Sequence, residues 1–332
     1  MTTAIVATGS MPTFHELILG LDNETMRLKT AYRNARRRST LLLAFGLTVI
    51  LAGLGAIGYP IILRVQSSVR DDQVVARTER TVNDWPYPQA EDEIKAAQLY
   101  NQRLAGDHNR TLGEATDPFS SAPGITSTNN GNNASARDDE YMSLLDAGDN
   151  IMGSILIPKI SVNLPIYHGT SDAALAAGSG HLYGTSLPVG GPSTHSVLTG
   201  HRGLVQAMMF TRLDELKIGD TFYIKVMGEQ LGYKIDRISV IEPNDLSQFT
   251  IKPGEDRVTL MTCTPYGVNT HRLLVSGIRA AIPGQIPEPA HGQHDPRTIM
   301  LWSLTGACST AIIGTAIVRR RNQVMPIRHR AK

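Results

Sequence analysis

Two long apolar stretches without a charged residue constrain this chain of 332 residues more than any other feature. The first covers residues 41–63 and the second covers residues 299–318. At about 1.5 Å per residue, a helix of either length crosses the roughly 30 Å hydrocarbon core of a bilayer. We therefore predict transmembrane helices over residues 41–63 and 298–318. A signal peptide is the alternative for the first, and a buried core helix is the alternative for the second.

The flanks of these stretches indicate an uncleaved anchor and its orientation. The first stretch begins too far from residue 1 for a signal peptide, and no small-residue cleavage site follows it. Positive charge is retained in the cytoplasm, so both termini are predicted to lie inside a two-pass cell-membrane protein, with the domain between them outside. The basic residues just before the first stretch are Arg27, Lys29, Arg33, Arg36, Arg37 and Arg38, and those just after the second are Arg319, Arg320, Arg321, Arg328, Arg330 and Lys332.

The predicted segments follow from these anchors and from composition. Residues 1–40 are a cytoplasmic tail, 64–150 an external helical and loop segment, 151–282 a β-rich domain, 283–297 a proline-rich spacer, and 319–332 a basic cytoplasmic tail. Within the segment before the β-rich domain, apolar spacing predicts an amphipathic helix over 92–104 and a short one over 137–147. Between them, residues 113–133 are rich in Ser, Thr, Gly, Asn and Pro, which is typical of a long exposed loop.

Residues 151–282 alternate short β-rich runs with turn residues. Seven or eight short strands with Gly-, Pro- and Asp-rich turns predict a mainly β fold, either a closed barrel or a sandwich. Short helical turns are expected at 172–177 and 207–216. The runs cover residues 154–160, 163–169, 195–201, 221–227, 233–241, 257–263 and 271–279.

The external domain contains a single cysteine, Cys263, because the other one, Cys308, lies inside the second apolar stretch. The two are predicted to lie in different phases and therefore cannot form a disulfide. An unpaired thiol outside the membrane indicates reactivity, and a buried structural cysteine is the alternative.

Three residues of the β-rich domain could act together on an amide. Cys263 ends an apolar run before Thr264-Pro265, His201 follows another run, and Arg272 begins the next strand. Adjacent antiparallel strands would bring Cys263 and Arg272 side by side. A thiolate attacks a carbonyl, a histidine protonates the departing amine, and a guanidinium stabilises the developing oxyanion. Taken alone, His201 would be a turn histidine and Arg272 a solvated strand end.

Other functions lack their motifs. A formal net charge of +2 gives no basic excess for a nucleic-acid partner. The sequence has neither a G-x-S-x-G elbow nor an H-E-x-x-H zinc motif, and we predict no metal and no cofactor. We assign only structural roles to His168, His181, His195 and His271.

The segments 258–263 and 199–203, followed by Arg272, resemble the sortase signature, a T-L-x-T-C run, a G-H-R and a downstream arginine. The two anchors and Asp117-Pro118-Phe119 further resemble class C, the pilus-building sortases. This resemblance implies a closed eight-stranded β-barrel over residues 151–282. It also implies a lid in which Asp117 pairs with Arg272 and Phe119 covers Cys263.

By this resemblance the chain is a cysteine transpeptidase that cleaves an LPxTG-like sorting signal of a secreted pilin. Cys263 is the implied nucleophile, His201 the acid and base, and Arg272 the oxyanion group, while a lysine amine of another pilin accepts the threonine carbonyl. Membrane lipid is the other expected partner. The alternatives are a housekeeping sortase that anchors proteins to the cell wall and a non-catalytic membrane-tethered binding module.

Overall fold

The computed structural model describes residues 13–107, 119, 134–243, 245–283 and 286, and six single positions between 303 and 315. Helix α1 (Phe14–Asn83) is shared by two compact units, one ending at Gly58 and the other beginning at Tyr59 and containing the barrel.

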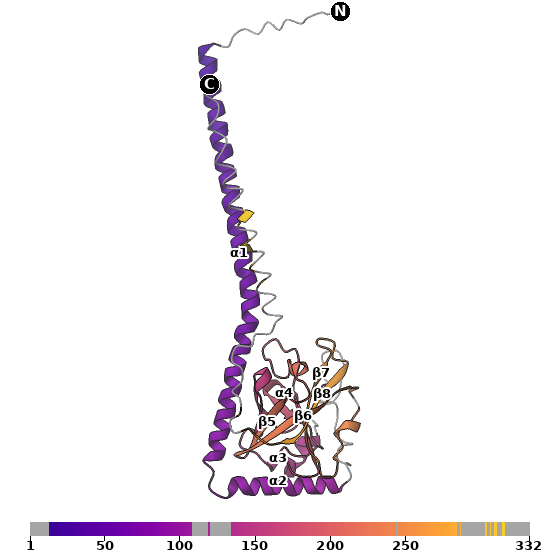
Figure 1. Cartoon of the computed structure of the whole chain (residues 1–332). Coiled ribbons are helices and arrows are strands. Elements are labelled where there is room, and N and C mark those ends of the chain that lie inside the picture. The colour runs from indigo at the N-terminus through magenta and orange to yellow at the C-terminus, as the bar shows by residue number, and fades with distance from the viewer. Residues whose placement is uncertain are drawn as a thin grey trace, which may run out of the picture. The chain divides into compact units, whose positions relative to one another are not determined.

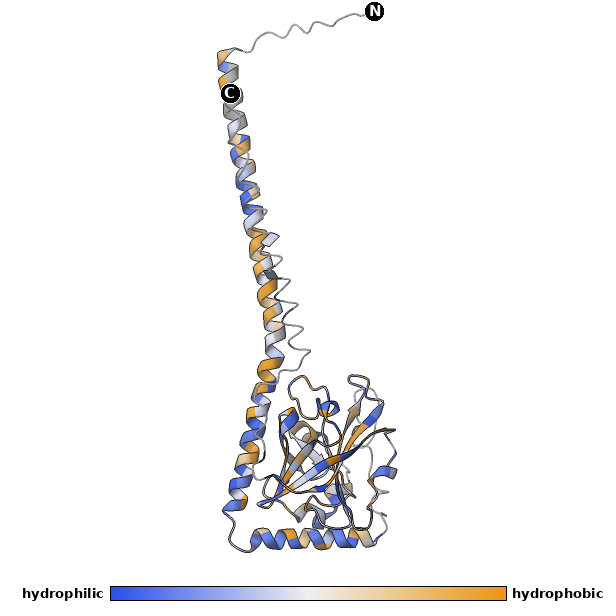
Figure 2. Ribbon diagram, viewed as in Figure 1, coloured by the Kyte–Doolittle hydropathy of each residue, from blue (hydrophilic) through white to orange (hydrophobic). Residues whose placement is uncertain are grey.

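Helix α1 includes the first predicted membrane span, residues 41–63. Within the described part of the chain it is the one helix that is long and apolar enough to cross a bilayer, and none of its most apolar window is buried. Figure 2 shows apolar residues along the middle of this helix. By length and composition such a helix fits a membrane anchor or a signal sequence. The second predicted span, 298–318, lies almost wholly outside the described residues.

Beyond Tyr59, the end of α1 is joined to the barrel by polar contacts. The Arg64 guanidinium Nε donates to the Val205 carbonyl at 3.3 Å, and the Asn163 amide donates to Asp72 at 2.8 Å. One turn before the helix ends, Glu79 accepts a hydrogen bond from Lys225 at 3.0 Å.

Helix α2 (Gln89–Gly106) covers the predicted helix over 92–104 and extends it at both ends. Its buried face contains Ile94, Ala97 and Leu104, as the apolar spacing indicates, and also Asn101. The Asn101 amide donates to the Leu187 carbonyl at 3.0 Å and accepts from the Leu187 N–H at 2.7 Å. Because both polar ends of the amide are satisfied, a buried asparagine is tolerated here.

The helix predicted over 137–147 is shorter in the structure. A 3₁₀ turn, η2 (Ala134–Arg137), precedes α3 (Asp139–Ser143), and the Asp138 side chain caps α3 by accepting from the Tyr141 N–H at 3.0 Å. Leu144 is already extended and Leu145 has a φ of 61°, so the helix cannot continue.

The barrel is closed, with strand order β1-β2-β3-β4-β7-β8-β6-β5, and Figure 1 shows its strands. The strands are β1 (Ile151–Ile157), β2 (Val162–Tyr167), β3 (Ser179–His181), β4 (Thr194–Thr199), β5 (Thr221–Val226), β6 (Glu229–Ile241), β7 (Asp256–Thr264) and β8 (His271–Ala280). The predicted eight-stranded barrel is therefore confirmed, and the sandwich is excluded.

The short elements between and among the strands match the sequence predictions to different degrees. Helix α4 (Asp172–Ala177) lies where predicted, and the Ser171 hydroxyl caps it by accepting from the Ala174 N–H at 3.2 Å. The turn predicted over 207–216 contains only the short 3₁₀ helix η4 (Leu213–Glu215). Strand β3 is missed because it is three residues long and contains a central Gly180, which gives no alternation to detect. The remaining short 3₁₀ turns are η3 (Pro158–Ile160) and η5 (Ser247–Phe249).

The strands β4, β7 and β8 are buried on both faces. In β7, Val258 and Leu260 belong to the main core, whereas Met261 and Cys263 belong to a second cluster with Phe119 and Phe249. Alternate residues of a strand face opposite sides, so the second cluster lies on the outer face of this part of the barrel. Cys263 is thus not a barrel-interior residue.

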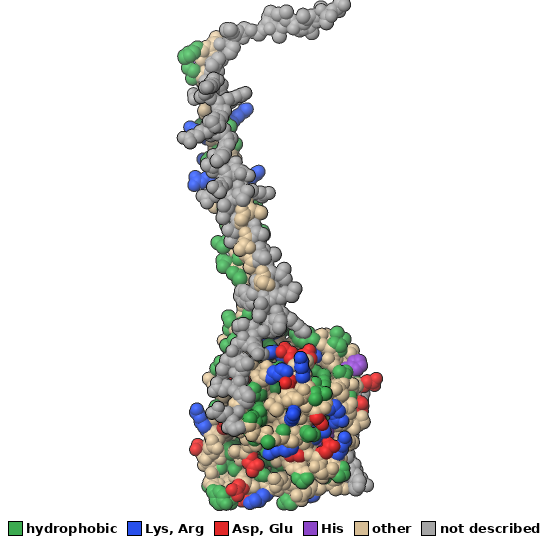
Figure 3. Space-filling model, viewed as in Figure 1, with side chains coloured by type: hydrophobic (Ala, Val, Ile, Leu, Met, Phe, Trp, Pro, Cys, Tyr) green, Lys and Arg blue, Asp and Glu red, His purple; other side chains and the backbone are tan. Residues whose placement is uncertain are grey.

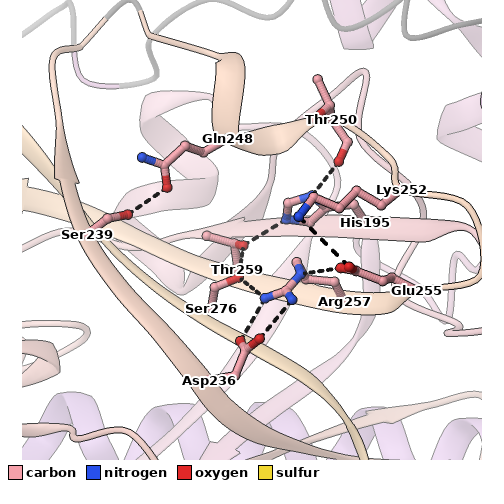
Figure 4. A network of polar contacts seen from close by, with 10 residues as sticks. All are labelled: His195, Asp236, Ser239, Gln248, Thr250, Lys252, Glu255, Arg257, Thr259 and Ser276. Atoms are coloured by element: carbon pink, nitrogen blue, oxygen red, sulfur yellow. Dashed lines mark hydrogen bonds and ion pairs between the residues drawn. The ribbon is translucent and has the colours of Figure 1, made fainter.

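The same face of β7 carries a polar network that Figure 4 shows. Arg257 donates twice to Asp236, at 2.7 and 2.8 Å, and once to the Ser276 hydroxyl at 3.0 Å. His195 contacts the Thr259 hydroxyl at 2.7 Å and the Thr250 carbonyl at 3.2 Å. The network therefore joins β4, β6, β7 and β8 to the loop over 242–255.

Elsewhere on the visible surface of the barrel, Lys and Arg side chains are interspersed with Asp and Glu side chains (Figure 3).

Two buried histidines predict how stability depends on pH. Burial lowers the pKa of His195 to about 4 and the pKa of His181 to about 4. The unfolded chain, with histidine near pKa 6.5, therefore binds more protons than the folded chain between about pH 4 and 6.5. Each histidine should cost on the order of 2 kcal/mol of unfolding free energy when the pH falls from about 7 to about 5.

Urea denaturation of the full-length chain in detergent micelles, followed by tryptophan fluorescence, measures this loss. In His195→Asn, which keeps a donor for the Thr250 carbonyl, the loss should shrink by on the order of 2 kcal/mol. The exposed His271, changed to Asn, serves as the control and should leave the loss unchanged. An equal loss in wild type and His195→Asn would contradict the prediction.

Candidate active site

Cys263 and Arg272 are directly opposite each other on neighbouring strands. The antiparallel register of β7 and β8 pairs these two residues one step before the strands end at Thr264 and His271. Both are nearly buried, with 6% of Cys263 and 3% of Arg272 exposed. Their place at the end of the sheet follows from the Pro265-Tyr266-Gly267 turn, since proline cannot donate to a continuing ladder.

His201 is brought to the same place by the strand on the other side of β7. Strand β4 pairs with β7 in parallel, and its last registered pair is Thr199 with Met261. The Gly200 N–H donates to the Met261 carbonyl at 3.1 Å, and the Thr262 hydroxyl donates to the Gly200 carbonyl at 2.7 Å. Counted two residues past Thr199, this register aligns the position of His201 with that of Cys263.

The glycines that flank His201-Arg202 have physical reasons. A Cβ on Gly200 would lie 2.7 Å from the Phe210 ring, so no other residue fits beneath that ring. Gly203 has a φ of +87°, a left-handed conformation that residues with a Cβ adopt at a cost, and an added Cβ would lie 3.3 Å from the Tyr266 ring. The two glycines of the G-H-R-G sequence therefore allow the chain to leave β4 while it stays packed closely against β7.

Phe119 lies over the three candidate residues. Its ring centroid is 5.5 Å from that of His201, and the Arg272 guanidinium carbon is 5.2 Å from the Phe119 centroid. Phe119 is 7% exposed and shares an apolar cluster with Cys263. A guanidinium over an aromatic face is an attractive arrangement, so the contact holds the ring against Arg272.

The other two members of the predicted lid, Asp117 and Pro118, lie outside the described residues, and so does the predicted pairing of Asp117 with Arg272. The Arg272 guanidinium donates through Nη1 to the carbonyls of Asn269 and His271, at 3.0 and 2.9 Å. These two bonds to the β7–β8 turn fix the orientation of the Arg272 side chain.

The surroundings of His201 favour its neutral form. Burial lowers the pKa of His201 below its usual value, and the carboxylate of Asp172, at the start of α4, partly opposes this effect. Sequence reasoning did not single out Asp172, because nothing local to α4 indicates that this helix begins near His201.

The Cys263 sulfur, the His201 imidazole and the Arg272 guanidinium thus belong to the same end of the three neighbouring strands β4, β7 and β8. This set can attack a carbonyl, exchange a proton with an amine and donate to an oxyanion. Among the described residues, no group of three or more His, Cys, Asp and Glu side chains is arranged to hold a metal ion. A groove of about 200 Å³ lies elsewhere, between α1 and the β5–β6 hairpin, and none of the three residues lines it.

Comparison with known proteins agrees with this arrangement. Residues 155–280 match the family model of the Sortase domain. The structure of sortase C from Streptococcus pneumoniae is 38% identical over 64% of this chain and 100% of that chain, with a TM-score of 0.54. This chain belongs to the sortase family. Sortase C-1 from Actinomyces oris is 44% identical over 58% of this sortase and 99% of its own chain, with a TM-score of 0.50.

The curated relatives match a smaller part of this sortase. Sortase A from Streptococcus agalactiae is 30% identical over 117 residues, which are 34% of this chain and 47% of that protein. The chain spans about half the length of the curated relatives it matches. The predicted family is confirmed, and the similar solved structures are those of C-type sortases.

Replacing Phe119 with alanine should uncover this site of the sortase. Alkylation of Cys263 by iodoacetamide, followed by mass spectrometry of its peptide, should accelerate by roughly tenfold or more. Returning water to His201 should also raise the midpoint of its NMR titration, because burial is the main cause of its lowered pKa. Leu246→Ala, which trims the same cluster, should leave both values near wild type. Unchanged labelling in Phe119→Ala would remove the covering role.

Proposed function

We propose that this sortase is a cysteine transpeptidase with Cys263 as nucleophile, His201 as general acid and base, and Arg272 as the oxyanion group. The observation that carries the proposal is the pairing of Cys263 with Arg272 on β7 and β8, with the exit of β4 holding His201 on the other side of β7. A solvated strand end is a poor account of an arginine that is 3% exposed.

In the first step, the neutral His201 takes the proton of the Cys263 thiol, and the thiolate attacks the carbonyl carbon of the threonine in an LPxTG-like sorting signal. Arg272 donates to the oxygen of the tetrahedral intermediate as it becomes negative. When the intermediate collapses, the threonine–glycine C–N bond breaks and His201 gives a proton to the leaving amine. The product is a thioester between Cys263 and the threonine.

In the second step, a lysine amine of another subunit attacks the thioester. His201, now neutral, takes the proton from that amine, and the sulfur leaves as a thiolate. One amide has been exchanged for another, so the reaction needs no oxidant, reductant or hydrolysed nucleotide. The lowered pKa of His201 suits this half of the cycle, since a neutral imidazole is the form that accepts the proton.

Pilin subunits are the proposed substrates. The sortase C of Streptococcus pneumoniae, described with pilin substrate specificity, and the sortase C1 of a group B streptococcal pilus island are similar over most of their chains. The contact of Phe119 with Arg272 and His201 supports the class C assignment, in which a lid covers the site. A housekeeping sortase usually has no lid. In this proposal Asp117 pairs with Arg272 when the lid is closed, and Pro118 stiffens the segment.

We place the catalytic unit outside the cytoplasmic membrane, where secreted pilins pass. The apolar part of α1 supports an anchor on the N-terminal side. A second anchor over 298–318, with both termini in the cytoplasm, follows from the basic residues that flank the apolar stretches.

Substitution of each proposed catalytic residue tests the mechanism. Cys263→Ala should form no thioester, and His201→Ala and Arg272→Ala should each lower kcat by roughly a hundredfold or more. Turnover of a fluorogenic sorting peptide and mass spectrometry of the Cys263 adduct measure these losses. Arg279→Ala is the matched control, because Arg279 lies on the same strand with its guanidinium over the Tyr233 ring at 5.7 Å. An Arg272→Ala enzyme as fast as Arg279→Ala would refute the oxyanion role.

Purified pilin distinguishes polymerisation from cell-wall anchoring. Pilin that carries an LPxTG-like signal should form a ladder of covalent oligomers when incubated with the full-length enzyme. Dimethylation of the pilin lysines should abolish the ladder, because a tertiary amine cannot become an amide. Cleavage of the signal without a ladder from unmodified pilin would favour the housekeeping alternative.

A further inference from the structure

Arg202 links the residues that follow the proposed acid–base group and the proposed nucleophile. It comes directly after His201, and its side chain is 4% exposed. Its Nη1 donates to the Thr264 hydroxyl at 3.1 Å, and Thr264 comes directly after Cys263. One side chain therefore spans from the end of β4 to the end of β7.

Two further contacts hold the guanidinium in place. Its Nη2 forms a hydrogen-bonded ion pair with Asp214 in η4, and its guanidinium carbon lies 5.8 Å from the centroid of the Tyr266 ring. Asp214 and Tyr266 come from the two loops that follow β4 and β7. The arginine is thus held by the loop after β4, which contains His201, and by the loop after β7, which begins two residues past Cys263.

We propose that Arg202 is a positioning residue that fixes the separation between the His201 imidazole and the Cys263 thiol; the proposal rests on the catalytic roles given above. The regular β4–β7 ladder ends at Thr199, and past it the bonds through Gly200 and the Arg202 bond to Thr264 link the two segments that leave these strands. The arginine is the last of these cross-links along the chain. We call Arg202, Thr264 and Asp214 the Arg202 clamp.

Without the clamp, the His201 loop is tied to β7 at Gly200 alone among these contacts. Proton transfer between an imidazole and a sulfur or amine requires hydrogen-bond distance, and a displacement of about 1 Å can cost on the order of a hundredfold in rate. Loss of the clamp should therefore act on the chemical step more than on substrate binding.

Removal of the guanidinium should leave the fold intact. Asp214 has 43% of its side chain exposed, so its carboxylate stays solvated without the arginine. The Arg202 Nε has no hydrogen-bond partner among the described residues, and a methionine removes that buried donor while filling similar space.

Arg212 provides a matched control in the same loop. Its side chain is 9% exposed and donates through Nε and Nη2 to Glu215 at 2.8 and 2.7 Å, so it shares the residue type, the burial and an acidic partner in η4. A further bond of its guanidinium, 3.4 Å long, goes to the Ile160 carbonyl. Neither partner adjoins His201 or Cys263.

The test compares full-length Arg202→Met, Arg202→Lys, Thr264→Val and Arg212→Met. We expect Arg202→Met to lower kcat about tenfold or more with KM within about threefold of wild type. Thr264→Val retains both charges of the ion pair but removes the acceptor, so it should lower kcat in the same direction. Arg202→Lys should be intermediate, because an ammonium cannot bridge both partners as the guanidinium does. Arg212→Met should stay within about twofold of wild type.

A second readout does not depend on turnover. In a Phe119→Ala background, the pH profile of Cys263 alkylation reports how close the imidazole lies to the thiol. Arg202→Met and Thr264→Val should move this profile to higher pH, and the double variant should move it no further than the larger single shift. Arg212→Met should leave it in place.

The outcomes separate the clamp from the function on which it rests. If Arg202→Met and Thr264→Val match Arg212→Met in kcat and in alkylation profile, Arg202 is only a structural residue and the proposal is overturned. A wild-type enzyme without transpeptidase activity would instead overturn the proposed function. The alkylation profiles would then still decide whether Arg202 positions His201.

Discussion

The hydrogen-bond ladder on the two sides of β7 is the constraint from which the candidate site follows. On one side β8 runs antiparallel and sets Arg272 opposite Cys263; on the other, β4 runs parallel and ends at Thr199, two residues before His201. A slip of one residue in either register would turn a side chain to the opposite face. The buried network at the far end of β7 opposes such slips, because Arg257 donates to Ser276 of β8 and to Asp236 of β6, and His195 of β4 contacts the Thr259 hydroxyl of β7.

Much of this fold could be predicted because its signals are local. The apolar runs and turn residues of 151–282 predict most strands, and the sequence after Cys263 predicts a hairpin to Arg272. The family resemblance, supported by the Sortase match over residues 155–280, then selects a barrel over a sandwich. The position of His201 was harder, because its neighbour in space is not its neighbour in sequence.

The features that the sequence did not predict depend on contacts between distant segments. Strand β3 is too short to alternate, and it exists because β2 and β4 pair with it on both sides. Buried Asn101 lies on a helix face that apolar spacing assigns to hydrophobic residues. It is accommodated there because its amide forms two hydrogen bonds with the backbone of Leu187. Arg202 is visible as part of G-H-R-G, but its bond to Thr264 requires the parallel pairing of strands that are remote in sequence.

That parallel pairing also has a consequence for the order of events in the life of the molecule. Strands β4 and β7 are separated in sequence by the β5–β6 hairpin, and pairings between such distant segments form slowly. Until β4 and β7 have paired, Cys263 is not held near His201. Assembly of the reactive centre is in this way a check on completed folding.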